Sequence, residues 1–144
     1  MQPESKKLLE IFNQQFKELT AIYHRAASQH DISDNEFWVW YALFALDGEQ
    51  SQQSICEMWS LPKQTVNSVV SGMIKKGLVY LETIPGTRNK KVIRLTEAGQ
   101  KFGEKVILNV YEAEQRAIGQ ISPQQLQLCT ELLAKYISLL DEEI

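Results

Sequence analysis

The chain has 144 residues and a formal net charge of −3, and 44% of its residues are hydrophobic. These values fit one globular domain, or one compact unit with an extension. No apolar run approaches the roughly 20 residues of a membrane-spanning helix, and no secretory signal is visible, so we expect a cytoplasmic protein. The two cysteines, Cys56 and Cys129, lie far apart without CxxC spacing, so we expect neither a zinc site nor a disulfide framework.

Two helices are predicted in the first third of the chain. Hydrophobic residues at three- and four-residue spacing predict a long helix over about residues 5–29. Ser33 and Glu36 have the spacing of a capping box, in which Glu36 reaches back, and a second helix then runs to about Leu46. Apolar residues occupy most of the circumference of this second helix, so we expect it at the centre of the fold.

A short helix followed by a second amphipathic helix is predicted next. The first begins with a cap at Ser51 and ends near Trp59. Pro62 suits the first position of the next helix, which runs to about Lys76, and Gly77 suits its left-handed end. The residues expected to face inward from these two helices are Ile55, Met58, Trp59, Val66, Val70, Met73 and Ile74.

The next segment has the pattern of a two-stranded hairpin. Residues 78–84 are strand-like, Pro85-Gly86 turns the chain, and residues 91–95 alternate as a returning strand. The layout of short helix, polar-faced helix and hairpin is that of a winged helix-turn-helix. We therefore predict a mainly α fold with a small β-hairpin wing, an α+β arrangement.

Two further helices are predicted after the hairpin. Thr96 caps one that runs to about Gly119 and carries the apolar residues Phe102, Val106, Ile107 and Val110. Ser122 and Gln125 have capping-box spacing at the start of the last helix. The apolar stripe of this last helix comprises Leu126, Cys129, Leu132, Leu133, Tyr136, Ile137 and Leu140.

The first and last helices both carry long apolar stripes that one small core has limited room to receive. Packing the stripes against a second copy is economical, and soluble homo-oligomers are most often two-fold. We therefore expect a homodimer. The alternative is that both stripes fold back onto the same chain.

A basic segment stands out in this acidic chain. Residues 61–94 hold seven lysines and arginines against one acid, a net charge of +6, and the remainder of the chain therefore carries −9. Such a concentration of positive charge favours a surface for a polyanion, and nucleic acid is the foremost candidate.

The polar face of the helix after Pro62 is the candidate recognition surface. Short polar side chains allow close approach to a major groove, and Gln or Asn can pair with adenine through both of its groups there. The N-terminal residues of the second helix meet the base edges in helix-turn-helix docking. The candidate residues are Lys63, Gln64, Thr65, Asn67, Ser68 and Ser71. The alternative is that they form only the solvated side of an amphipathic helix.

The hairpin tip supplies the second group of candidate contacts, Arg88, Asn89, Lys90 and Lys91. A narrow minor groove attracts arginine, and Arg88 is the candidate for insertion. Lys90 and Lys91 are candidates for phosphate contacts, which govern affinity and salt dependence more than sequence choice. The alternative is a charged edge that prevents strand-to-strand aggregation.

A family resemblance is carried by the run LPKQTVNSVVSGMIKKGLVYLETIPGTRNKKVIRLTEAG. This run resembles the DNA-binding core of the MarR family of bacterial regulators, and the order of elements around it is also similar. The most specific pieces are Thr65-Val66, the helix end Lys76-Gly77-Leu78-Val79 and the join from Arg94 to Gly99. The resemblance implies one MarR-like unit over residues 1–144, with a winged-helix lobe at 33–95 and dimerisation helices at 5–30 and 97–144.

The resemblance also implies a function. Members of this family are two-fold dimers that bind pseudo-palindromic operators, and many are repressors that release DNA when a small aromatic or phenolic ligand binds. The family's wing has an aspartate followed by arginines. Here Thr87 stands at the aspartate position and Arg88 follows it, so the carboxylate that usually orients this arginine is absent.

The resemblance places a ligand cleft where the dimerisation helices meet the DNA-binding lobe. The candidate lining residues are Tyr23, His24, Trp38 and Tyr41, with Trp40 and Phe44 nearby. Aromatic walls with a few polar groups suit a flat organic acid or phenol, and Arg25 is available for an anionic ligand. The alternative is that these aromatic residues are core. No other cofactor and no metal is expected.

Two other functions remain as alternatives. A thiol-based redox sensor would use Cys56, because Cys129 lies on an apolar stripe where buried cysteines are usually inert. A winged-helix protein-interaction module would have the same fold, but the basic segment argues against it. An enzyme is not expected, since no phosphate loop, HExxH, GxSxG or metal-spaced His/Cys cluster is present.

Overall fold

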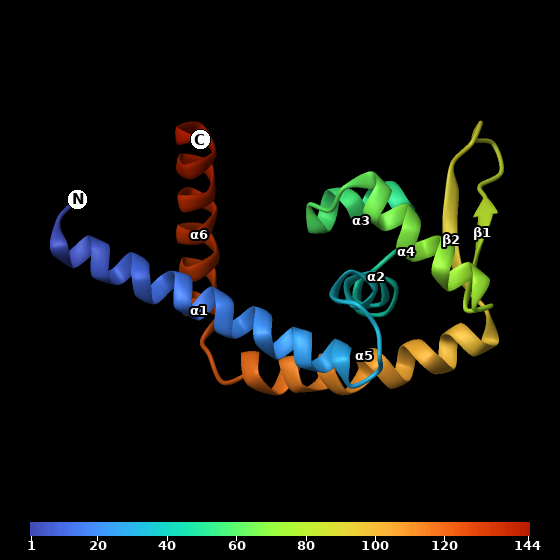
Figure 1. Cartoon of the computed structure of the whole chain (residues 1–144), viewed down its shortest axis with the longest axis horizontal. Coiled ribbons are helices and arrows are strands. Elements are labelled where there is room, and N and C mark those ends of the chain that lie inside the picture. Colours follow the sequence, from blue (N-terminus) through green and yellow to red (C-terminus); the bar gives the residue numbers. More distant parts are fainter. The chain divides into compact units, whose positions relative to one another are not determined.

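The computed structural model describes residues 1–144 as six helices and one two-stranded antiparallel sheet (Figure 1). The elements are α1 (Pro3–Ser28), α2 (Asp34–Ala45), α3 (Gln52–Trp59), α4 (Lys63–Lys75), β1 (Val79–Thr83), β2 (Lys91–Leu95), α5 (Glu97–Ile118) and α6 (Pro123–Glu143). The predicted fold class, mainly helical with a hairpin wing, is confirmed. None of the helices is both long enough and apolar enough to cross a membrane.

The chain divides into two compact units, Met1–Val110 and Tyr111–Ile144. The boundary between these units lies inside α5. The reason is that the first half of α5 belongs to the core of the first unit, where Val106 and Ile107 are buried and the ring of Phe102 lies 5.3 Å from that of Trp40.

Helix α2 forms the centre of the first unit, as its composition predicts. Its buried residues are Phe37, Val39, Trp40 and Ala42, and it packs against α1, α3 and α4. Aromatic side chains fill much of this core and supply large apolar areas. One side of α4 packs against this core, so the opposite side of α4 faces solvent.

The helices start at the predicted caps, but two of the predicted capping boxes, at α2 and α6, are not reciprocal. The Ser33 hydroxyl accepts from the Glu36 N–H at 3.1 Å, but the carboxylate of Glu36 does not return the bond. It accepts from the Trp40 indole at 3.1 Å instead and pairs with Lys76 at 3.7 Å. The reciprocal capping box forms at α3, between Ser51 and Ser54. Glu36 therefore joins the start of α2 to the end of α4 rather than closing its own cap.

Two residues predicted to face inward are partly exposed. Met58 is 42% exposed and Ile74 is 39% exposed. The buried stripe of α4 consists of Val66, Val70 and Met73, and Ile74 lies about 100° further round the helix, because each residue turns the chain by that angle. The buried face of α4 is narrow, so two apolar residues that are adjacent in sequence do not both reach the core.

The hairpin pairs residues from Val79 with Leu95 to Thr83 with Lys91. Its turn contains Gly86 in a left-handed conformation (φ 81°), which glycine adopts without steric cost. At its root, the Ile93 N–H donates to the Gln50 carbonyl at 2.8 Å, which ties β2 to the α2–α3 connection. Figure 1 shows the hairpin extending from the first unit beside α4.

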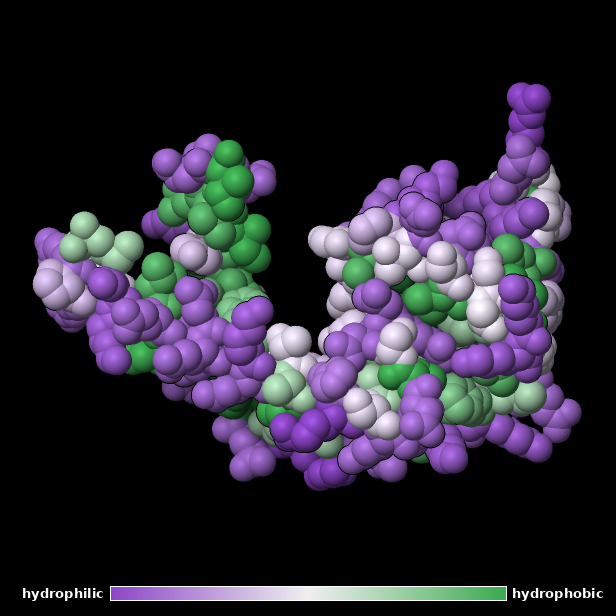
Figure 2. Space-filling view, viewed as in Figure 1, coloured by the Kyte–Doolittle hydropathy of each residue, from purple (hydrophilic) through white to green (hydrophobic).

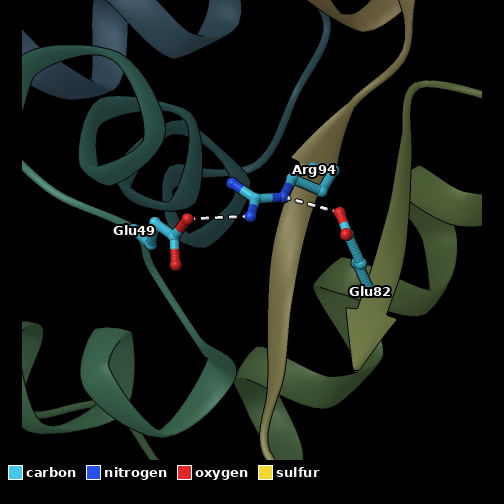
Figure 3. A network of polar contacts seen from close by, with 3 residues as sticks. All are labelled: Glu49, Glu82 and Arg94. Atoms are coloured by element: carbon cyan, nitrogen blue, oxygen red, sulfur yellow. Dashed lines mark hydrogen bonds and ion pairs between the residues drawn. The ribbon is translucent and has the colours of Figure 1, made fainter. Parts of the chain in front are cut away.

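Arg94 on β2 reinforces this attachment. Its side chain lies between two carboxylates, donating from Nη2 to Glu49 at 2.8 Å and from Nε to Glu82 at 2.9 Å (Figure 3). The hydrogen bonds to Glu49 and then Glu82 raise the pKa of Arg94 above its ordinary value. One guanidinium thus connects β2 with β1 and with the turn before α3.

The second unit consists of the end of α5 and all of α6. Helix α6 begins at Ser122, whose hydroxyl accepts from the Gln125 N–H at 3.1 Å, and it buries no side chain. Large apolar residues stay exposed along it: Leu128, Leu132, Tyr136, Ile137, Leu139 and Leu140. Figure 2 shows hydrophobic side chains gathered along this helix. Cys129, which lies on this stripe, is exposed in the single chain.

The contact between α5 and the chain after α4 yields a stability prediction. A Cβ added at Gly99 would overlap the backbone carbonyl of Leu78, which cannot move like a side-chain tip. We expect Gly99→Ala to lower the free energy of unfolding by about 1–3 kcal/mol, as overpacking does. Gly72→Ala is the control, since its Cβ meets open space and alanine favours a helix by about 0.5–1 kcal/mol. Urea unfolding measures both, and equal effects would contradict the close packing.

The Arg94 contacts yield a second prediction. We expect Arg94→Met to release the hairpin root, so that the Ile93 amide exchanges hydrogen several-fold faster, because local opening of the Ile93–Gln50 hydrogen bond becomes easier. Lys101→Met is the matched control, since it removes an exposed ion pair with Glu97 outside the hairpin. Amide exchange followed by NMR measures both variants. If the Ile93 amide of Arg94→Met is as well protected from exchange as in the parent, the contacts of Arg94 with Glu49 and Glu82 do not hold the wing.

Candidate nucleic-acid interface

Helix α4 presents the predicted recognition residues on the side opposite its buried stripe. Five of the six, namely Lys63, Gln64, Asn67, Ser68 and Ser71, are exposed, and Thr65 is half-buried. The Ser71 hydroxyl makes a long contact of 3.5 Å with the Asn67 side-chain carbonyl. A bond of that length is weak, so the Asn67 amide remains available to an outside partner.

A tight turn aims the N-terminus of α4 outward. Ser60 adopts a left-handed conformation (φ 52°), and the Leu61 N–H returns to the Cys56 carbonyl at 3.1 Å. Pro62 occupies the N-cap position, one residue before the predicted one, with extended backbone angles. The turn between α3 and α4 is therefore closed by backbone bonds, and Lys63 and Gln64 follow it directly.

The four predicted wing residues, Arg88, Asn89, Lys90 and Lys91, are all exposed at the hairpin tip and its return. Thr87, at the position where a carboxylate was expected, donates its hydroxyl to the Ile84 carbonyl at 2.7 Å. It therefore closes the turn rather than orienting Arg88.

A hollow of about 560 Å³ lies between the wing and the start of α3. It is lined by Ser51, Gln52, Gln53, Leu81, Thr87, Arg88, Asn89, Lys90 and Lys91. The α3 residues of this wall were not predicted as site residues, because they are uncharged and their only sequence signal is the cap at Ser51. The Ser51–Ser54 capping box occupies the Ser54 N–H at this helix start. The wall therefore offers a phosphate mainly the partial positive charge of the helix dipole, beside the basic wing.

The ion pairs show which positive charges of the basic segment are free. Arg94 is held by two carboxylates and Lys76 by Glu36, so neither contributes a full charge to a partner. The other five, Lys63, Lys75, Arg88, Lys90 and Lys91, make no ion pair within the chain. The free charge therefore belongs to the two surfaces predicted to meet nucleic acid, the exposed face of α4 and the wing.

A separate cavity of about 390 Å³ lies among α1, α2 and the end of α3. Of the four predicted ligand residues, Tyr23, His24 and Trp38 line it, while Tyr41 lies behind the wall with its ring 5.3 Å from that of Trp38. Arg25 does not line the cavity, and Trp40 is buried in the core. The complete lining is Phe16, Leu19, Thr20, Tyr23, His24, Asp34, Asn35, Phe37, Trp38, Trp59 and Leu61.

The cavity has one polar pair that sequence reasoning missed. Nδ1 of His24, on α1, lies 2.7 Å from the Asp34 carboxylate, on the first turn of α2. Trp59 was also missed as a lining residue; its indole N–H donates to the Trp38 carbonyl at 3.0 Å. Neither had a signal in the sequence, because ten and 21 residues separate these partners along the chain.

The cysteines do not form a site together. Cys56 is half-buried on α3 and Cys129 is exposed on α6, and both thiols are free. The Cys56 contact in the α3–α4 turn is made by its backbone carbonyl, not by its sulfur. No group of three or more histidine, cysteine or acidic residues has the geometry to hold a metal ion.

Comparison with known proteins agrees with this geometry. Residues 30–88, which include α2, α3, α4, β1 and the hairpin turn as far as Arg88, match the sequence model of the MarR family. The HTH-type transcriptional repressor NicR of Pseudomonas putida is 23% identical over 127 residues, covering 88% of this chain and 80% of NicR.

Solved structures share the fold. A MarR family regulator from Neisseria meningitidis has a TM-score of 0.78 at 24% identity, over 95% of this chain and 96% of that one. The MepR–DNA complex of S. aureus has a TM-score of 0.67 at 23% identity, over 90% and 94% of the two chains. The winged-helix layout agrees with the match of residues 30–88 to the MarR family of transcriptional regulators.

Proposed function

We propose that this protein is a sequence-specific DNA-binding repressor that acts as a dimer on a pseudo-palindromic operator. The observation that carries the proposal is the exposed polar face of α4 beside a hairpin whose basic tip residues make no ion pair within the chain. NicR, a named repressor, and MepR, solved on DNA, are similar to this chain and support the assignment.

The two surfaces would take different parts in binding. Gln64 and Asn67, in the first turns of α4, would read base edges in the major groove, where amide side chains can pair with adenine. Lys63 and the wing lysines would contact phosphates and position the lobe. Arg88 would enter the adjacent minor groove, and the hollow between the wing and α3 would receive the backbone that separates the two grooves.

The terminal helices would form the dimer. Exposed apolar residues follow one another along α1 (Leu8, Ile11, Phe16, Leu19 and Ile22), and α6 buries none of its own. Contiguous apolar surface of this kind marks an interface. A two-fold dimer would present two copies of α4, which bind half-sites about 34 Å apart when they match successive turns of the same groove.

A small aromatic or phenolic ligand in the cavity would release the DNA. The cavity volume of about 390 Å³ lies within the usual range for ligand sites, and its walls are mostly aromatic with few polar groups. The walls come from α1, a proposed dimerisation helix, and from the lobe that carries α4. A ligand there would favour dimers whose recognition helices are wrongly spaced for the operator, which is a shift of population.

Variants of the two surfaces test the DNA-binding proposal. We expect Asn67→Ala to lose about 1–3 kcal/mol of discrimination at one base pair and to keep the salt dependence of the parent. Arg88→Ala, and the double variant Lys90→Ala with Lys91→Ala, should weaken binding to all duplexes and lower the log–log salt slope by about one for each phosphate that the variant no longer binds. Fluorescence anisotropy on a set of singly substituted duplexes measures both quantities.

Lys101→Ala controls for the loss of a positive charge away from both surfaces, since Lys101 lies exposed on α5. It should bind as the parent does. If the wing variants also bind as the parent does, the assignment of the wing is wrong. If Asn67→Ala weakens all duplexes equally, α4 does not read bases.

A charge placed on the α6 stripe tests the dimer. We expect Leu132→Glu to raise the dimer dissociation constant about a hundredfold or more, because an unpaired buried carboxylate costs several kcal/mol. Gln124→Glu adds the same charge off the stripe, at the exposed start of α6, and should leave the dimer intact. Sedimentation equilibrium measures both. A stable dimer with parental DNA affinity in Leu132→Glu would rule out this interface.

A further inference from the structure

We propose that the cavity among α1, α2 and α3 takes an organic cation with an aromatic or apolar body, in preference to an organic acid. The proposal concerns the ligand class of the cavity, and its consequence for transcription rests on the DNA-binding function proposed above. Three features of the cavity carry it: the aromatic walls, the sign of the charges that line it and the occupied start of α2.

Aromatic rings make up much of the cavity wall. Trp38 lies at the centre, with the ring of Tyr23 at 4.9 Å and that of Trp59 at 5.0 Å. Trp38 and Trp59 are half-buried, so part of each ring remains available to the cavity. Rings of this kind attract a cation through their negative faces, tryptophan most strongly, and several rings around one site form the cages that bind quaternary ammonium groups.

The charges in the lining favour the same sign of ligand. Asp34 and His24 are the only ionisable acid and base there, and no lysine or arginine lines the cavity. When His24 is neutral, its Nδ1–H donates to Asp34 and the pair carries one negative charge. When His24 is protonated, the pair is neutral overall. A carboxylate ligand therefore finds no unpaired cation in either state, whereas an ammonium group finds a net negative charge at Asp34 when His24 is neutral.

The start of α2 does not offer a replacement site for an anion. A free helix N-terminus attracts negative charge, but the Ser33 hydroxyl already caps the Glu36 N–H at 3.1 Å. The first turn also carries two acids, Asp34 and Glu36, which offset the positive end of the helix dipole. An added carboxylate would meet the Asp34 carboxylate at this edge of the cavity.

Occupancy of the cavity would reach α4 through its far wall. Leu61 lines the cavity and lies two residues before the first residue of α4. The indole N–H of Trp59 donates a hydrogen bond to the Trp38 carbonyl. On the near side, His24 and Tyr23 belong to α1. A cation seated on Trp38 would therefore contact both α1 and the turn that aims α4.

Calorimetric titration of the protein without DNA tests the ligand class, with benzyltrimethylammonium as the probe. Neopentylbenzene, its uncharged carbon isostere, and phenylacetate, an anion of similar size, are the comparisons. We expect the cation to bind tighter than either. Asp34→Asn should weaken cation binding about fivefold, the effect of one partly exposed charge pair. Asp31→Asn makes the same charge change three residues away, outside the lining, at a left-handed residue that asparagine tolerates.

The outcomes separate clearly. Preference for the cation, lost in Asp34→Asn and retained in Asp31→Asn, supports the proposal. Phenylacetate binding as tightly as the cation, equal effects of the two variants, or no binding of the cation would each overturn it. Because this titration contains no DNA, failure of the DNA-binding proposal would leave the result unchanged. Release of a bound duplex by the same probe then tests the link between the cavity and α4.

Discussion

The burial of α2 is the constraint on which the rest of the first unit depends. Phe37 and Trp40 are fully enclosed, and their burial places α1, α3 and α4 around one helix. Apolar area removed from water stabilises a fold by about 25 cal/mol per Å², so aromatic side chains of this size dominate the core. The exposed face of α4 is a consequence, because the opposite stripe of Val66, Val70 and Met73 is committed to α2 and its neighbours. The aromatic cavity is a second consequence, since Trp38 on the same helix lines it together with residues of α1.

Electrostatics then divides the basic segment into two groups with different tasks. Arg94 and Lys76 are paired within the chain and hold elements together, while Lys63, Arg88 and the wing lysines remain free. The two carboxylates that pair with Arg94 are Glu82 on β1 and Glu49 in the turn before α3 (Figure 3). The contacts that neutralise Arg94 therefore also hold the root of the wing in place. A wing anchored at its base and charged at its tip can meet a phosphate backbone without adding flexibility at the attachment. Thr87, which closes the turn, takes no part in orienting Arg88.

Sequence periodicity predicted the elements because each is governed by local chemistry. Ser33, Ser51 and Ser122 cap helices, Gly77 and Gly86 adopt positive φ, and β2 covers the predicted residues. Features that depend on distant pairs were not predictable in the same way. Neither the His24–Asp34 contact nor the Arg94–Glu49 contact leaves a pattern in the chain, since each joins separate elements. Ile74 and Met58 were misplaced because hydrophobicity alone does not show how wide a buried stripe is.

The central claim is that α4 and the wing read a specific DNA sequence. The most direct test is binding of the unmodified protein to the DNA flanking its own gene, against a scrambled duplex of equal length, over a range of salt concentrations. We expect tighter binding to the native duplex, with a log–log salt slope of several, because each phosphate contact contributes about 0.9 to the slope. Equal and weak binding to both duplexes at every salt concentration would contradict the account.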